Sequence, residues 1–199
     1  MSMIKRKIAK QLKKVKFLVL LGAILSGCSL ETEYEKVKRK ELASGKEVKE
    51  LFLGLEFGMS RQQFFDICWE WNKQGVLTEG AHEFRVLYQP ELGSGSKLNM
   101  FFYPKFEEET IYYMPVEFKY QNWFPTNPNT SSDKLVDDVV NLLESWYGKG
   151  FFRVEDKDGA FAMVKIDGNR LIRVYIKSIS EVRVDMLDLR VKDIKQIYS

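Results

Sequence analysis

Apolar and polar residues recur along the chain with two periods, one typical of helices and one of strands. The helical period occurs over 61–74 and 133–147, where apolar residues three or four positions apart form one stripe. Ser60 is a suitable N-cap for the first segment, a glutamine three residues later completes a capping box, and a glycine follows each segment. These features predict two helices, and we expect Leu142 and Trp146 to lie on the buried face of the second.

Segments rich in β-branched and aromatic residues, bounded by turn-forming residues, account for most of the remaining chain after position 50. They predict strands at 51–57, 83–88, 97–103, 111–120, 151–154, 161–166, 171–176 and 182–187. Asp167-Gly168 is typical of a tight hairpin, and the tail 190–198 is predicted as a short helix.

The order of these segments is strand, helix, meander, helix, meander. It indicates an α+β fold with two main helices packed on antiparallel β-sheet. Each half of the domain has a helix, a glycine stop and several strands, so we expect two related halves.

The beginning of the chain has a different composition. Residues 1–16 contain seven basic side chains and no acidic one, and 17–27 are an apolar run of eleven residues. That run is too short to span a bilayer but suits the apolar region of a signal peptide. The rest of the chain contains 24 basic and 28 acidic residues, which give it a net charge of −4. The basic character therefore belongs to the leader, and nothing in the charge indicates nucleic-acid binding.

The leader ends in Leu25-Ser26-Gly27-Cys28, which resembles the lipobox of bacterial lipoproteins. The resemblance implies cleavage before Cys28 and acylation of its thiol, which would tether the protein to a membrane. An ordinary secretory signal would end in an A-x-A-like site, which is absent, and an uncleaved anchor would need a longer apolar run. In enteric-type lipoproteins an aspartate after the cysteine marks inner-membrane retention, so Ser29 implies the outer membrane.

The sequence thus predicts a signal peptide (1–27), a lipidated charged tether (28–49) and one α+β globular domain (50–199). Phe57–Ser60 and Trp146–Lys149 resemble stretches of small envelope domains of the outer-membrane assembly lipoprotein (SmpA/BamE) and beta-lactamase-inhibitor-protein type. This resemblance implies a domain that binds other proteins rather than one that catalyses a reaction.

Candidate catalytic and metal-binding residues are few. Cys68 lies on the apolar face of the first predicted helix, which favours a core residue over a nucleophile. His82 is the only histidine, so multi-histidine metal sites are excluded, and we expect it in a surface loop. Asp156–Gly159 resembles the opening of a calcium loop but is better explained as a turn, as are the three acids at 107–109. We predict no catalytic residue, no metal site and no cofactor.

The segment 122–132 is polar and contains two prolines, yet it also contains Trp123 and Phe124. Large aromatic side chains in such a loop either fold back over the core or bind a partner, which would be a protein or a glycan. We therefore expect a non-enzymatic envelope lipoprotein that binds a protein or a glycan. The alternative is an envelope hydrolase that uses two carboxylates not identifiable from the sequence.

Overall fold

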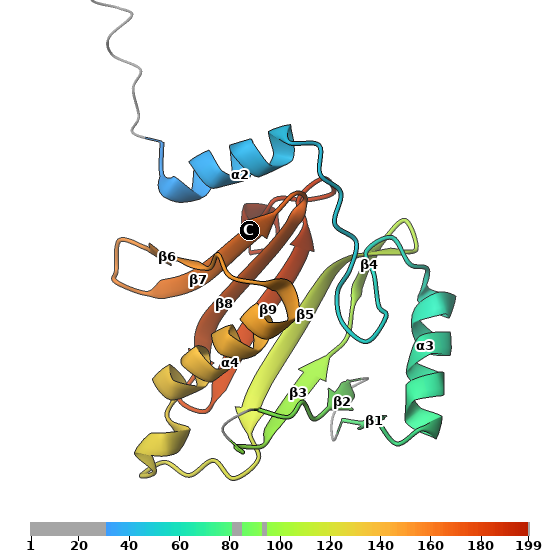
Figure 1. Ribbon diagram of the computed structural model, residues 1–199, viewed down its shortest axis with the longest axis vertical. Coiled ribbons are helices and arrows are strands. Elements are labelled where there is room, and N and C mark those ends of the chain that lie inside the picture. Colours follow the sequence, from blue (N-terminus) through green and yellow to red (C-terminus); the bar gives the residue numbers. More distant parts are fainter. Residues whose placement is uncertain (1–30, 81–84, 93–94, 199) are drawn as a thin grey trace, which may run out of the picture. The chain divides into compact units, whose positions relative to one another are not determined.

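The structure is a computed structural model that describes residues 31–80, 85–92 and 95–198 (Figure 1). The chain divides into two compact units, Met1–Lys36 and Val37–Ser199. The predicted signal peptide 1–27, Cys28 and Ser29 lie outside the described residues, as does His82. Among the described helices, none has the length and apolar character needed to cross a membrane.

The second unit is built on one antiparallel sheet, which confirms the α+β fold class. In the described part of the chain it has nine strands in the order β1-β2-β3-β5-β9-β8-β7-β6, with β4 paired to β5. The strands are β1 (Leu77–Glu79), β2 (Val86–Tyr88), β3 (Leu98–Phe102), β4 (Lys105–Glu107), β5 (Thr110–Tyr120), β6 (Phe152–Glu155), β7 (Phe161–Asp167), β8 (Arg170–Ser178) and β9 (Glu181–Asp188). The helices are α2 (Glu33–Ala43), α3 (Arg61–Lys73) and α4 (Ser132–Tyr147), with short 3-10 turns at Pro128–Thr130 and Ile194–Gln196.

Helix α4 lies across one face of the sheet and contacts β5, β8 and β9 (Figure 1). Ser131 is its N-cap, and Gly148, with φ of 77°, ends it. Its apolar stripe is buried as the 3.6-residue period predicts, and Leu142 is a core residue, whereas Trp146 is half-buried. The core between helix and sheet contains Leu135, Val139, Val116, Phe118, Val174 and Val184.

Helix α3 begins with the predicted capping box. The Gln63 backbone N–H donates to the Ser60 hydroxyl at 3.2 Å, and the Ser60 N–H donates to Gln63 Oε1 at 2.8 Å. Only Phe64 of this helix is buried. The helix therefore stands beside the β1 end of the sheet and does not cover a sheet face as α4 does (Figure 1).

The predicted strand at 51–57 is wrong. The chain reverses at Leu53 and Gly54, which have φ of 54° and 77°, and the Leu51 N–H donates to the Leu55 carbonyl at 2.9 Å. This compact turn buries both leucines fully. Leucines at the alternate positions 51, 53 and 55 predict one face of a strand. The reversal of the chain instead brings Leu51 and Leu55 together.

The tether predicted for 28–49 is also shorter than expected, because its second half packs on the domain. Lys38 forms an ion pair with Asp193 at 2.9 Å, and the carboxylate of Glu41 accepts a hydrogen bond from the Gly168 N–H at 3.0 Å. The Val48 N–H donates to Asn169 Oδ1 at 2.6 Å. These contacts are ion pairs and hydrogen bonds, so the pattern of hydrophobic residues could not predict that this segment packs on the domain.

Most other predicted elements are present, with small shifts at their ends. Gly168 and Asn169 form the two-residue turn between β7 and β8, one position later than predicted. Two short strands, β1 and β4, were not predicted, since three residues are too few to show a period of two. The turn after β4 contains two of the predicted turn acids, Glu108 and Glu109, both with positive φ.

Candidate binding groove

The loop between β5 and α4 separates the two aromatics that the sequence singled out. Trp123 is half-buried and packs against the hydrophobic core, whereas Phe124 is 62% exposed. The Thr130 hydroxyl donates to the Asn127 carbonyl at 3.1 Å and helps to shape the loop. The core-covering role thus applies to Trp123, and Phe124 alone is available to a partner.

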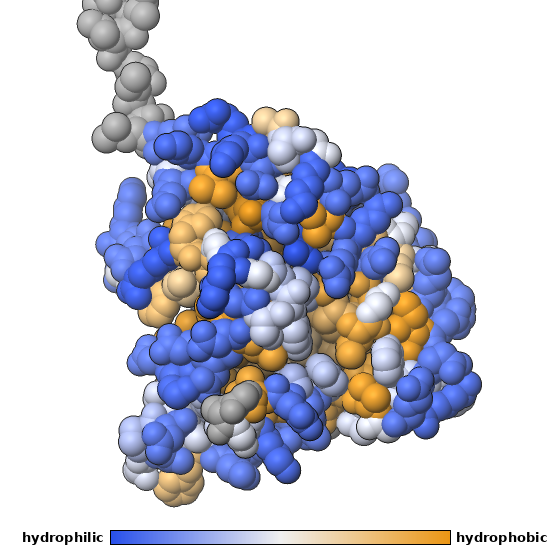
Figure 2. All heavy atoms as spheres, in the orientation of Figure 1, coloured by the Kyte–Doolittle hydropathy of each residue, from blue (hydrophilic) through white to orange (hydrophobic). Residues whose placement is uncertain are grey.

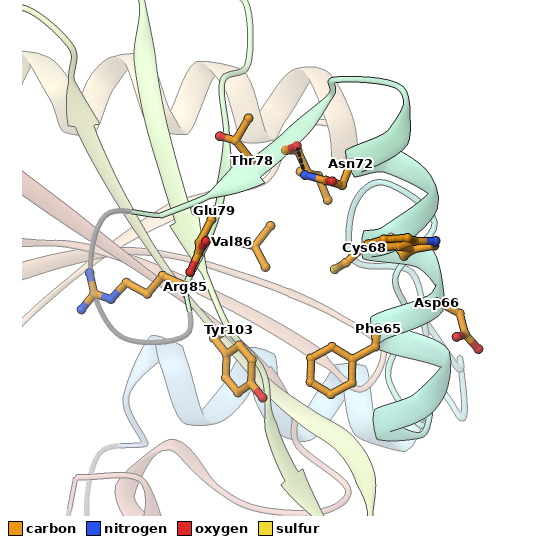
Figure 3. Close-up of a pocket in the computed structure, with 11 residues that line it drawn as sticks. Phe65, Asp66, Cys68, Asn72, Thr78, Glu79, Arg85, Val86 and Tyr103 are labelled. Carbon is orange, nitrogen blue, oxygen red and sulfur yellow. Dashed lines mark hydrogen bonds between the residues drawn. The ribbon is translucent and has the colours of Figure 1, made fainter.

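A larger apolar surface lies between α3 and the strands beside it. It forms an open groove of about 590 Å³, here called the α3 groove (Figure 3). Most of its wall is apolar, and the main contributors are Phe65, Cys68 and Trp69 from α3 and Leu77, Val86 and Tyr103 from the sheet side. Figure 2 shows hydrophobic residues gathered on this part of the molecule. Volume and lining are those of a typical binding site.

The groove exists because α3 is attached to the rest of the domain near its two ends. Phe64, in its first turn, packs its ring edge-on against Tyr103 with a centroid distance of 5.6 Å. Near its end, the Trp71 indole N–H donates to the Leu53 carbonyl at 2.8 Å, and the Asn72 amide donates to the Leu77 carbonyl at 2.9 Å. Between these ends, Ile67 and Cys68 are half-buried and pack against the hydrophobic core, and the groove opens beside Cys68.

Two large aromatic side chains on α3 are exposed to water at this groove. Phe65 is 46% exposed and Trp69 is 62% exposed. The Lys73 ammonium lies 5.5 Å from the centre of the Trp69 ring. The lysine shields only part of the ring from water, because Trp69 is still 62% exposed. Exposed aromatic side chains that cluster beside a groove are more frequent at interaction surfaces than on the rest of a protein surface.

Cys68 lies on the groove wall and points into the cavity (Figure 3). Burial raises the pKa of its thiol to about 12, so the thiol is protonated at neutral pH. A thiolate is the nucleophilic form, and the geometry therefore offers no nucleophile here. The sequence prediction placed Cys68 in the core, but in the structure it is half-buried at a cavity.

Charged groups occur only around the edge of the α3 groove. Asp66 accepts a hydrogen bond from the Gln62 side chain at 2.8 Å, and Glu79 projects from β1 (Figure 3). The one basic residue in the lining, Arg85, is already paired with Glu117 at 2.5 Å. In Figure 3 the Asp66 carboxylate lies on the outer side of α3, away from the cavity, so Glu79 is the charge among these lining residues that is left at the edge.

Carboxylates elsewhere in the described part of the chain are poor candidates for acid catalysis. A glycosidase acid needs a raised pKa, but every carboxyl pKa that is clearly displaced here is lowered. Burial raises the pKa of most of these groups, and cationic or hydrogen-bonding partners outweigh it. The groups are Glu47, Glu117, Asp167, Asp188 and Asp193. None of these five carboxyl groups therefore has the raised pKa that a glycosidase acid needs.

The possible calcium loop has the geometry of a turn. The Asp156 carboxylate accepts hydrogen bonds from the backbone N–H groups of Asp158 and Ala160, each at 2.9 Å, and Gly159 has φ of 83°. Across residues 31–80, 85–92 and 95–198, no three His, Cys, Asp or Glu side chains are grouped closely enough to hold a metal ion.

The α3 groove was missed in the sequence because its residues were assigned to the core. In the sequence, Phe65 lies next to the apolar stripe of α3 and widens it, whereas Trp69 lies off that stripe. A tryptophan on the polar side of an amphipathic helix was the one signal that could have indicated a binding surface.

Comparisons of the chain with models of protein families, with curated proteins and with solved structures found no match.

Proposed function

We propose that the chain is a lipid-anchored envelope protein whose α+β domain binds another protein through the α3 groove. The observation that carries this proposal is the open apolar groove with Phe65 and Trp69 exposed at its side. Apolar lining with charge only at the edge is typical of sites for hydrophobic side chains. Glycan binding would need polar groups that face the cavity beside the aromatic rings, whereas most of the exposed wall of the groove is apolar.

The partner's chemistry follows from the edge of the groove. Glu79 gives it a negative charge, since Arg85 is paired with Glu117 and Asp66 points away from the cavity. A complementary partner presents apolar side chains with Lys or Arg beside them, because like charges facing each other oppose binding. The lipid anchor rests on the lipobox at Leu25–Cys28, together with the basic and apolar leader before it.

Site-specific photo-crosslinking in living cells tests the groove directly. A photoreactive phenylalanine analogue replaces Trp69 in the full-length protein, and in a matched control it replaces Ile179, which is 71% exposed at the turn between β8 and β9. We expect a discrete crosslinked protein from position 69 and none from position 179. Adding Phe65→Ser should abolish that product. Crosslinks of equal intensity from both positions would contradict the proposal.

We also propose that the two halves of the domain are related, as their sequence plan suggests. Helix α3 is followed by β1, β2, β3, β4 and β5, of which β4 lies off the main strand order, and α4 is followed by β6, β7, β8 and β9. The sheet order β1-β2-β3-β5-β9-β8-β7-β6 supports this proposal, because the two sets occur in mirrored order and meet at the last strand of each.

A rearranged chain tests the relation between the halves. Arg190 and Glu47 form an ion pair at 3.0 Å, so the two ends of the domain lie close enough to be joined by a short linker. A circular permutant with new ends in the loop after β5 should fold cooperatively, because each half then keeps its helix and strands. Failure to fold would argue against the halves as separate units.

A further inference from the structure

The sheet face opposite α4 carries a group of charged side chains. Successive side chains of a strand point to opposite faces, and Val116 and Phe118 of β5 point into the core. Glu117 therefore lies on the other face, where it is paired across the strands with Arg183 of β9. Only 6% of Glu117 is exposed.

Three cations share the Glu117 carboxylate. Arg85, Lys177 and Arg183 contact its oxygens at 2.5, 2.6 and 2.9 Å. Burial raises the pKa of Glu117, but the cations outweigh it and the net pKa is lowered, so the group is ionised at neutral pH. One carboxylate cannot accept hydrogen bonds from all the N–H donors of three cations, so these groups also bind further acceptors, as Arg183 does with Asp185 and the Tyr113 hydroxyl.

Beside this group is a hollow of about 210 Å³ at a break in the sheet, here called the basic hollow. On one side of β5, pairing with β3 ends at Val116 and pairing with β4 starts at Tyr113. Pro115 lies in the gap between them and lines the hollow. Proline has no N–H to leave unpaired there and contributes an apolar surface.

The charges that line the basic hollow do not balance. Arg85, Lys105 and Arg183 give three positive charges, and Glu117 gives one negative charge. Lys105, at the start of β4, is exposed and forms no ion pair with any described residue. Arg183 is held in place by hydrogen bonds to Asp185 at 3.1 Å and to the Tyr113 hydroxyl at 3.1 Å.

We propose that the basic hollow binds a phosphate-type oxyanion through Arg85, Lys105 and Arg183. Guanidinium groups donate pairs of N–H bonds that match phosphate oxygens, and a lysine adds a mobile point charge. The lining residues alone have two surplus positive charges, which Asp185 offsets in part through Arg183, and the remainder suits a group that carries one or two negative charges. The same chemistry is offered by free inorganic phosphate and by the phosphodiester of a lipid headgroup.

Calorimetric titration of the full-length protein in detergent tests the site at constant ionic strength. The probes are inorganic phosphate and glycerophosphoglycerol, the water-soluble headgroup of phosphatidylglycerol. We expect Lys105→Gln to weaken binding by about tenfold or more, as loss of a charge-assisted hydrogen bond does. Arg85→Gln should have a similar effect. The matched control is Lys177→Gln, which removes a cation that contacts Glu117 but does not line the hollow.

The outcomes separate the two sources of the anion. Binding of inorganic phosphate alone would assign the site to a free anion, and binding of the headgroup would assign it to a lipid. No binding of either probe would overturn the proposal, and so would an equal loss in Lys177→Gln, because net positive charge would then explain the effect. Lys105 does not line the α3 groove, so this result does not depend on the crosslinking experiment.

Discussion

Replacing Glu117 by glutamine should destabilise the folded protein strongly at neutral pH. The variant keeps the shape of the side chain but leaves three cations without the carboxylate that they share. Removing one partner of a fully buried ion pair costs about 3–5 kcal/mol. The three cations are partly hydrated, with 21–41% of each side chain exposed. We therefore expect a loss of about 2–3 kcal/mol in the free energy of unfolding.

Urea denaturation of both proteins at several pH values measures this effect. The folded-state pKa of Glu117 lies below its ordinary value of 4.5. Its contribution is therefore complete above the unfolded-state pKa and is lost as the pH falls through the folded-state pKa. The difference between the two proteins should be largest at neutral pH and should shrink in acid.

Glu181→Gln is the matched control, because Glu181 is more exposed and contacts only Lys177, at 3.5 Å. It should change the unfolding free energy by less than about 0.5 kcal/mol. An equally small effect of Glu117→Gln at pH 7, or a large effect that persists unchanged in acid, would refute the reasoning.

Four further predictions concern the core, a turn, the groove and the membrane anchor. Leu142→Ala should lower the unfolding free energy by about 2–5 kcal/mol, whereas Trp146→Ala, at a half-buried position, should cost less than Leu142→Ala does in the same urea titration. Gly168→Ala should cost about 2 kcal/mol or more in thermal unfolding, because the added methyl group would overlap a neighbouring backbone carbonyl oxygen and φ is +59°. Cys68 should react slowly with maleimide at pH 7 and much faster as the pH approaches 12, whereas a rapid reaction at pH 7 would contradict the raised pKa. Cys28→Ala should abolish the incorporation of labelled fatty acid, and normal labelling would refute the lipidation site.

The sequence predicted the helices and longer strands that depend on residues only a few positions apart. The apolar stripe of α4 and the capping box of α3 both follow from residues a few positions apart. The longer strands follow from runs of β-branched and aromatic residues, which were predicted within a few residues of their ends.

The remaining features depend on contacts between distant residues, and a single sequence does not contain them in readable form. The Leu53–Gly54 reversal resembles a strand in the sequence because leucines occupy the alternate positions 51, 53 and 55, although only Leu51 and Leu55 are buried. Helix α3 has enough apolar residues for a core helix, and only the placement of β1 and β2 shows that Phe65 and Trp69 remain exposed. The four residues that line the basic hollow with charge come from β4, β5, β9 and the residue before β2, up to 98 positions apart.

The polar attachment of residues 37–49 limits how far the domain can work from a membrane. If acyl chains are added at Cys28 as we propose, eight residues, 29–36, separate the anchor from Val37, the first residue of the compact unit. From Cys28 to Val37 the chain spans at most about 30 Å, and less because α2 already begins at Glu33, against about 75 Å for the 22 residues of the tether predicted from sequence. Any partner of the α3 groove would then have to reside on the same bilayer or pass within a few nanometres of it. The segment between the anchor and the domain is therefore short. It would raise the local concentration of the domain near membrane-bound partners and keep the domain away from distant ones.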